Sequence, residues 1–189
     1  MKEAQETDGQ LYIRYVKASD EAAFVSLYEK YRDGVIIFLY GMLKNMDDAE
    51  ELMMDTFAVL ASKTARYKER SDSSFKTWLY AIARNQARMF LRKNKHSFIS
   101  LDEEDAPEPV DPHIAIDEEL IDDEEKARLY SALQSIEPDY RQTLYLMYFE
   151  DMKPAEISAV MKKNVKQVYN LIERGKRSLK KVLGDSMME

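Results

Sequence analysis

Apolar residues recur at every third or fourth position along most of this chain, which is the spacing of one face of an α-helix. The longest such series runs from residue 24 to residue 42, and another runs from residue 49 to residue 60. Strict alternation of apolar and polar residues, which predicts strands, is rare, and the chain has only five glycines. We therefore predict an all-α fold. The apolar positions of the two series are Phe24, Leu27, Tyr28, Tyr31, Val35, Phe38, Leu39 and Met42, then Ala49, Leu52, Met53, Thr56, Phe57 and Leu60.

Capping residues predict where several of the helices begin. Asp47, with Glu50 three residues later, resembles a capping box and predicts a helix that starts after residue 47. Asn164 and Gln167 have the same spacing and predict the start of the last helix. Pro154 stands where the first turn of another helix tolerates proline, because the first backbone N–H of a helix has no partner within it.

The segment from residue 75 to residue 95 has two faces of different chemistry. Its apolar side contains the only tryptophan of the chain, Trp78, whose spacing places it in the core. Arg84, Arg88 and Arg92 recur at steps of four on another side, and the segment has six Lys or Arg and no acid. Because no Glu stands four residues away to balance them, these arginines favour a nucleic-acid backbone as partner over a solvated helix face. Aromatic residues at the start of this helix suit stacking on unpaired bases.

The net charge of −7 hides blocks of opposite sign. Residues 61–98 carry +8 and residues 152–189 carry +5, whereas residues 99–125 contain 13 acids and no Lys or Arg. An acidic segment that also contains prolines is typical of a flexible linker, and this one is long enough to let two units lie far apart. We predict three parts: a helical unit at residues 1–95, an acidic linker at residues 96–125 and a second helical unit at residues 126–189.

The C-terminal part has the pattern of a helix-turn-helix, with two helices joined by a turn at residues 162–164. We expect the second helix to bury Val165, Val168, Ile172, Gly175 and Leu179. Its outward side offers amides, which can read adenine edges, and arginines, which can read guanine in the major groove. The stabilising effect of cations near a helix C-terminus is an alternative explanation for Arg177, but it does not explain Lys166 in the first turn. The outward residues are Lys166, Gln167, Tyr169, Asn170, Glu173, Arg174 and Arg177.

Other chemistry finds little support in the sequence. Asp48, Glu51 and Asp55 share one side of a helix, where they serve either solubility or the docking of a basic protein. The chain has no cysteine, its two histidines have no second ligand at a suitable spacing, and it lacks both a paired nucleophile and base and a Gly-rich phosphate loop. We therefore predict no enzyme activity, no catalytic residue, no cofactor, no metal site and no small-molecule substrate. Without a long apolar run or a signal peptide, we expect no membrane insertion and a cytoplasmic location.

Three motifs follow one another along the chain in a fixed order. They comprise residues 47–52 with Phe57, then Phe75, Trp78, Leu79 and residues 82–85, then Glu156, Ile157, Val165, Val168 and Arg174. Together they resemble the bacterial RNA polymerase σ factors of the extracytoplasmic-function group, in the σ-70 family, over about residues 10–184. The first motif resembles the core-binding helix of the family's second region, the next its −10 promoter helix, and the last its fourth-region helix-turn-helix.

The resemblance implies a transcription initiation factor that directs RNA polymerase core to specific promoters. Its acidic helix would dock on the clamp helices of the β′ subunit through Asp48, Glu50, Glu51 and Asp55. Its last helix would read the −35 element of promoter DNA, and the unit around that helix would bind the β flap. The linker would thread the RNA channel, and an anti-σ factor would hold the protein inactive. Opening of the −10 element would fall to Ser73, Tyr80, Arg84, Asn85, Arg88 and Arg92.

A few positions depart from the family pattern. Met54 stands where glutamine is common, which implies that one contact to core polymerase differs from the family's. Lys162 stands where glycine is usual and Leu171 where arginine is frequent, and these two departures imply an unusual −35 preference. Two other classes of protein compete with this interpretation. One is a helix-turn-helix regulator that binds promoter DNA without core polymerase, although residues 10–95 show no ligand-pocket pattern. The other is an enzyme that acts on nucleic acid, although no catalytic cluster is evident.

Overall fold

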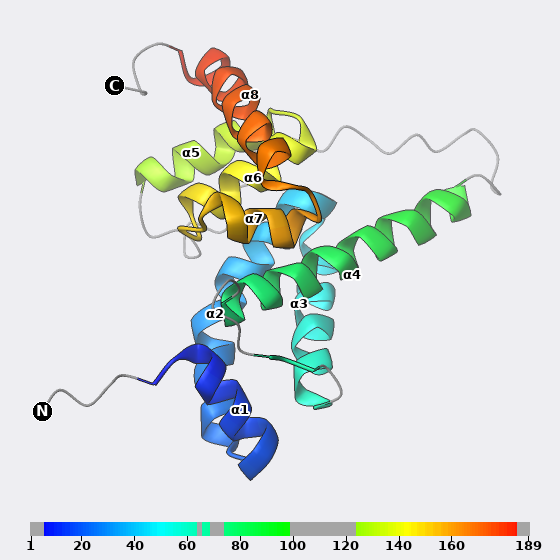
Figure 1. Ribbon diagram of the computed structural model, residues 1–189. Helices are drawn as coiled ribbons and strands as arrows, with labels where there is room; N and C mark the ends of the chain where they lie inside the picture. Colours follow the sequence, from blue (N-terminus) through cyan, green and yellow to red (C-terminus); the bar gives the residue numbers. More distant parts are fainter. Residues whose placement is uncertain (1–5, 64–65, 69–73, 99–123, 185–189) are drawn as a thin grey trace, which may run out of the picture.

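The described part of this protein is built from helices (Figure 1). The computed structural model describes residues 6–63, 66–68, 74–98 and 124–184, and only the backbone of residues 95–98. These parts contain eight helices and no strand, which confirms the all-α prediction. We call α1–α4 the N-terminal unit and α5–α8 the C-terminal unit. The helices are α1 (Asp8–Ala18), α2 (Glu21–Leu43), α3 (Met46–Ala61), α4 (Phe75–Phe98), α5 (Glu124–Gln134), α6 (Pro138–Tyr148), α7 (Pro154–Met161) and α8 (Val165–Leu183).

A tight turn separates α2 from α3. Lys44 ends α2 in the left-handed conformation, with a φ of 61°, and Asn45 then caps α3 by accepting from the backbone N–H of Asp48 at 3.0 Å. The prediction that Asp47 caps this helix is therefore wrong. Because the left-handed Lys44 reverses the chain at a single residue, α3 begins at Met46, and Asp47 lies inside its first turn.

Aromatic side chains fill the core of the N-terminal unit. The hydroxyls of Tyr12 and Tyr15 donate to the backbone carbonyls of Leu60 and Ala61, at 3.1 and 2.9 Å. These carbonyls lie at the C-terminal end of α3, where a helix leaves its last carbonyls without partners of its own. The ring of Trp78 in α4 lies 5.3 Å from the ring of Tyr12, centre to centre, and Trp78 is half-buried. The prediction that Trp78 belongs to the core is confirmed.

The helices α7 and α8 form the expected helix-turn-helix. Pro154 stands in the first turn of α7, and Asn164 caps α8 in a capping box that Gln167 completes, as predicted. Lys162 ends α7 with a φ of 52°, in the left-handed region that glycine adopts without strain. This turn is therefore formed with a lysine in the left-handed conformation.

A buried arginine ties α5 and α6 together. Arg141 of α6 donates to the carbonyl oxygens of Leu133, Gln134 and Ile136 around the end of α5, at 2.8 to 3.0 Å. A further bond of 2.7 Å reaches the carbonyl of Gly41 in α2. The carbonyls at a helix C-terminus carry the negative end of the helix dipole, so they suit a buried cation.

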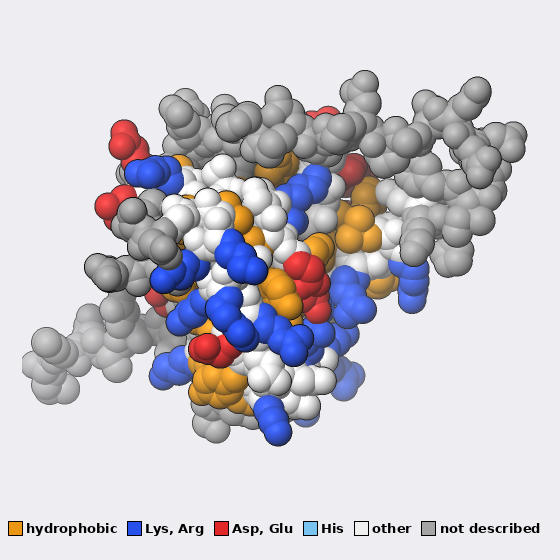
Figure 2. Space-filling view, turned by 90° about the horizontal axis from the view of Figure 1, so that it is seen from above, with side chains coloured by type: hydrophobic (Ala, Val, Ile, Leu, Met, Phe, Trp, Pro, Cys, Tyr) orange, Lys and Arg blue, Asp and Glu red, His pale blue; other side chains and the backbone are white. Residues whose placement is uncertain are grey.

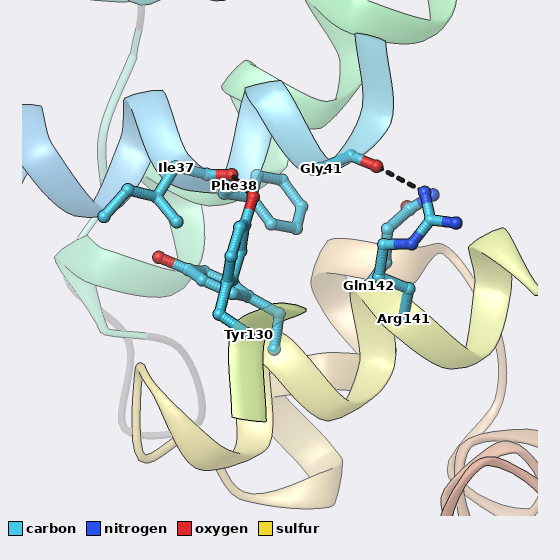
Figure 3. Close-up of a pocket in the computed structure, with 7 residues that line it drawn as sticks. Ile37, Phe38, Gly41, Tyr130, Arg141 and Gln142 are labelled. Atoms are coloured by element: carbon cyan, nitrogen blue, oxygen red, sulfur yellow. Dashed lines mark hydrogen bonds between the residues drawn. The ribbon is translucent and has the colours of Figure 1, made fainter. Parts of the chain in front are cut away.

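The two units pack against each other. The helix α4 lies along α7, α2 contacts α6, and buried residues from both units form one core (Figure 1). The hydroxyls of Tyr130 and Tyr145 donate to the carbonyls of Ile37 and Gly34 in α2, at 2.8 and 2.9 Å. Figure 3 shows Tyr130 and Arg141 reaching from the C-terminal unit to the backbone of α2. The sequence predicts that the units can lie far apart, whereas in this structure they are in contact.

Candidate nucleic-acid interface

The N-terminal end of α4 holds a carboxylate from the other unit. Ser74 precedes the helix, and its hydroxyl accepts from the backbone N–H of Thr77 at 3.2 Å. The hydroxyls of Ser74 and Thr77 both donate to Oε1 of Glu156 in α7, at 3.1 and 3.2 Å. The free N–H groups and the dipole at the start of a helix attract anions. This end of α4 is therefore a site for a negatively charged oxygen, and here α7 supplies that oxygen.

Lys76 of α4 forms an ion pair between the units. Its ammonium donates to the backbone carbonyl of Glu150 at 2.9 Å and lies 3.5 Å from the carboxylate of the same residue. The Glu150 side chain is 11% exposed, and burial raises its pKa above the ordinary value of 4.5, although Lys76 opposes the shift. The free-energy cost of removing this carboxylate from water is therefore larger than the stabilisation that its partners give to the charged form.

Arg84 lies buried between the units instead of facing outward. The residue is 5% exposed. Its Nε donates to Oε1 of Gln142 in α6 at 2.8 Å, and a terminal nitrogen lies 3.9 Å from the carboxylate of Asp139. Burial lowers the pKa of Arg84, and the nearby Arg88 lowers it further. The prediction of an outward row of three arginines is wrong at this position, because the C-terminal unit covers the side of α4 that carries Arg84.

Tyr80 is covered in the same way. It is fully buried, and its ring meets that of Phe38 edge to face at 5.3 Å. Its hydroxyl makes no hydrogen bond of ordinary geometry with a described residue, but it lies close enough to the carboxylate of Glu150 to interact with it. Burial raises the pKa of Tyr80 well above its ordinary value. Neither Tyr80 nor Arg84 can touch DNA while the units are packed in this way.

The rest of the predicted −10 surface on α4 is open. Asn85, Arg88 and Arg92 are exposed, as expected. The side-chain oxygen of Asn85 accepts from the ammonium of Lys162, in the turn between α7 and α8, at 3.3 Å. Ser73 lies outside the described residues. The packing therefore divides the predicted DNA contacts of α4 into a covered part and an open part.

The predicted outward residues of α8 are all exposed. Val168 and Ile172 are buried as expected, whereas Val165 is 40% exposed because it is the first residue of the helix, ahead of those that pack inward. Gln167 is held in place by the cap, since its Oε1 accepts from the backbone N–H of Asn164 at 2.9 Å. Figure 2, which views the molecule from above Figure 1, shows Lys and Arg side chains gathered on this face.

The acidic side of α3 is a second candidate surface. Glu50, Glu51 and Asp55 are exposed and Asp48 is half-buried, and none of them forms an ion pair with a described residue. Met54 on the same helix is 57% exposed. An acidic surface with an apolar side chain suits a basic protein partner, because opposite charges steer the encounter and the apolar group adds buried area.

Sequence reasoning missed the acids that meet α4. Asp139 belongs to α6, Glu156 to α7, and Glu150 to the segment between these helices. The charge pattern could not mark them, because residues 126–151 are close to neutral as a block. Only the packing of the C-terminal unit on α4 shows what these carboxylates do.

Among the described residues, no group of three or more His, Cys, Asp or Glu is placed to hold a metal ion. None of the described helices is both long enough and apolar enough to cross a membrane.

Comparison with known proteins assigns the two units to one family. Residues 27–97 match the family model of Sigma-70 region 2, and residues 126–179 match that of Sigma-70, region 4. The ECF RNA polymerase sigma factor SigW of Bacillus subtilis is 26% identical over 92% of this chain and 95% of its own. The RNA polymerase sigma factor CarQ of Myxococcus xanthus is 30% identical over 88% of this chain and 92% of its own. The chain belongs to the extracytoplasmic-function group of σ-70 factors.

This σ factor is a transcription initiation factor, and the function that the sequence resemblance implies is thereby confirmed. A solved structure of the sigma factor RpoE in complex with the anti-sigma factor NepR from Bartonella quintana supports the fold. Its TM-score is 0.64 at 19% identity, and the match covers 85% of this chain and 96% of that one. The basic surface of α4 falls in region 2 of the σ factor, and the helix-turn-helix falls in region 4.

Proposed function

We propose that this σ factor binds core RNA polymerase, directs it to promoters with a −10 and a −35 element, and helps to open the DNA. The observation that carries the proposal is that two separate basic surfaces, on α4 and α8, lie in the two matched σ regions. Two promoter elements need two such surfaces on one chain. We accordingly assign −10 binding to residues 1–95, a linker to residues 96–125 and −35 binding to residues 126–189.

The −35 element is read by α8. Asn170 can bond an adenine edge, and Arg174 and Arg177 can bond guanine or a phosphate. Because Oε1 of Gln167 is held by the cap, its amide is left to donate, which favours acceptor atoms on the base edges. Tyr169 is 55% exposed and offers an aromatic surface beside these polar groups. The remaining contacts on this face are Lys166 and Glu173.

The −10 element is bound by α4. Arg88 and Arg92 are placed to hold phosphates of the separated strands, and Asn85 can bond a base. Ser73, which precedes this helix in the sequence and lies outside the described residues, is a further proposed contact. Tyr80 and Arg84 complete the surface only after the C-terminal unit has left α4.

Core polymerase is contacted through Asp48, Glu50, Glu51 and Asp55 of α3, which face the basic clamp of the β′ subunit. The C-terminal unit binds the β flap. An anti-σ factor holds the protein inactive, in line with the RpoE relative that is bound to one. The σ factor needs no cofactor, catalyses no reaction itself, and acts in the bacterial cytoplasm, where polymerase and nucleoid lie.

A run-off transcription assay tests the proposal. Addition of the purified σ factor to core polymerase should start transcription from a subset of promoters, and the σ factor without core should start none. Tight promoter binding by the free protein, with no binding to core, would instead support a helix-turn-helix regulator.

The Arg88→Ala variant tests the DNA contact on α4. If Arg88 holds a phosphate, its removal should weaken promoter opening and lower the slope of log affinity against log salt by about one, while core binding stays intact. Arg128→Ala removes an exposed arginine of α5 and is the control, whose slope should equal that of the wild type. An unchanged slope for Arg88→Ala would mean that Arg88 is only a solvated surface charge.

A further inference from the structure

The connection between α3 and α4 is held against α1 at two described points. Near its start, the ammonium of Lys63 lies 4.5 Å from the centre of the Tyr15 ring and donates to the hydroxyl of Ser19 at 3.0 Å. Further along, the ring of Tyr67 meets that of Tyr12 edge to face, with the ring centres 6.1 Å apart. The described parts of this connection therefore take their place from α1.

The ring of Tyr67 is enclosed between α1 and α4. Its centre lies 5.7 Å from that of Phe75 and 5.2 Å from that of Trp78, both in the first turn of α4. Gly9 in the first turn of α1 is buried, and a Cβ at this position would lie 2.5 Å from the hydroxyl oxygen of Tyr67 and 3.0 Å from a ring carbon. Any side chain at position 9 would displace the ring. The glycine therefore allows the Tyr67 ring to lie directly against the backbone of α1.

Two cations flank the enclosed ring. Arg66 and Lys68 are exposed, and neither forms an ion pair with a described residue. Because Tyr67 fixes the chain between them, these side chains lose less freedom on binding a phosphate than cations on a freely moving loop. Tyr67 contacts the first turn of α4, which lies about 20 Å along the helix axis from Arg88, at 1.5 Å per residue. The two cations therefore stand at the end of α4 opposite to the arginines of its exposed surface.

We propose that Tyr67 is a positioning residue for −10 DNA: its ring, set against Gly9, holds Arg66 and Lys68 where they bind phosphates of the promoter strands. This inference rests on the proposed function, because it takes the beginning of α4 to lie on the path of the −10 DNA. It adds two phosphate contacts to those of α4. It also gives α1 a part in DNA binding, which α1 exercises through the Tyr67 ring.

The salt dependence of promoter binding tests the proposal, because its slope reports how many phosphates the cations of the protein hold. The σ factor with core polymerase binds a fluorescein-labelled promoter fragment, mismatched over the −10 element, at several salt concentrations. Arg66→Ala and Lys68→Ala should each lower the slope of log affinity against log salt by about one. Tyr67→Ala removes no charge. It should nevertheless lower the slope by about one, because released cations hold their phosphates for only part of the time.

Gly9→Ala tests the ring contact without changing the connection itself. The new methyl group should displace the Tyr67 ring and lower the slope in the same way as Tyr67→Ala. In a Tyr67→Ala background it should have no further effect, because there is no ring to displace. Alanine is a better helix former than glycine, so a lower slope for Gly9→Ala cannot be ascribed to a weaker α1.

Tyr67→Phe keeps the ring and is the matched control, whose slope should equal that of the wild type. In a chain with both Arg66→Ala and Lys68→Ala, the further change Tyr67→Ala should leave the slope as it is. A purely structural role would instead lower the affinity by the same factor at every salt concentration. Urea unfolding followed by Trp78 fluorescence shows that each variant has a folded N-terminal unit under the assay conditions.

The proposal is overturned if Tyr67→Ala keeps the wild-type slope, or if Tyr67→Phe lowers the slope as much as Tyr67→Ala does. It is also overturned if Tyr67→Ala lowers the slope equally in the chain that lacks both cations. Failure of the proposed function would appear separately, as no run-off transcription by the wild type with core polymerase.

Discussion

Replacement of Arg141 by methionine measures how the C-terminal unit is held together. The residue is 9% exposed, and its guanidinium donates to three carbonyls around the end of α5 and to Gly41 in the N-terminal unit. Arg141→Met keeps most of the apolar part of the side chain but removes every donor. The carbonyls of Gln134 and Ile136 then lose a charged partner inside the protein.

The expected loss in the free energy of unfolding is about 3 kcal/mol. A hydrogen bond from a charged group contributes about 1.5 to 3 kcal/mol. The four bonds cannot be added, because burial lowers the pKa of Arg141, which shows that the guanidinium loses favourable hydration when the protein folds. In addition, the carbonyl of Leu133 still accepts from the backbone N–H of Ile136 at 3.3 Å.

Urea unfolding, monitored by two spectroscopic signals, distinguishes the unfolding of one unit from that of the other. Far-UV circular dichroism reports all helices, whereas the fluorescence of Trp78, the only tryptophan, reports the N-terminal unit. With an m-value of about 2 kcal/mol/M, a loss of about 3 kcal/mol lowers the urea midpoint by about 1.5 M. The dichroism midpoint should fall by this amount. The Trp78 midpoint should fall less, because only the bond to Gly41 reaches that unit.

Arg128→Met, at an exposed position on α5, is the control and should change the free energy of unfolding by less than about 0.5 kcal/mol. A loss below about 1 kcal/mol for Arg141→Met would refute the reasoning, since it would mean that the carbonyls are satisfied without the guanidinium. Equal shifts in both signals would refute the separation of the units and show that they unfold together.

Two further predictions concern side chains at packed positions. Burial raises the pKa of Glu150 above 4.5, so its contribution to the free energy of unfolding is fully present below pH 4.5 and is lost as pH rises through the raised pKa. The glutamine in Glu150→Gln does not ionise, so the stability of this variant relative to the wild type should increase as pH rises. Urea midpoints of both proteins, measured from about pH 4 to about pH 7, check this. Parallel curves of midpoint against pH would contradict it. Gly175→Ala should destabilise the protein by about 1 to 2 kcal/mol, because the new Cβ would lie 3.1 Å from the fully buried Leu144 and 3.2 Å from the Cβ of Tyr140. Thermal unfolding by circular dichroism measures this, and a Tm at or above the wild-type value would show that Leu144 can move aside.

The features that the sequence predicted well are those that depend on residues of one helix. The capping box of Asn164 and Gln167 joins side chains and backbone groups three positions apart. The inward position of Val168 and Ile172 follows from the helical period alone. The exposure of the residues on α8 that are predicted to read the −35 element follows from the same period, because the opposite face must be buried.

The features that were predicted wrongly depend on backbone or packing outside the helix concerned. The sequence predicts Asp47 as the cap of α3, whereas the structure has Asn45. The difference comes from the left-handed turn at Lys44, which the spacing of polar residues does not reveal. The sequence predicts that Arg84 faces solvent, because the segment around it contains no acid to pair with it. In the structure Arg84 is buried, and its hydrogen-bond partner Gln142 stands 58 positions later in the chain. No local pattern connects those two residues, and only the docking of the units does.

The outer face of α8 is exposed while part of α4 is covered. If α8 reads the −35 element as proposed, the free σ factor can sample duplex DNA only through that helix, and such encounters should be brief because one element alone would supply the affinity. The second surface would become available only where polymerase and a matching −35 sequence hold the molecule long enough for the units to part. The packed form would then convert the order of two binding steps into a filter, which rejects sequences that match a promoter at one element only.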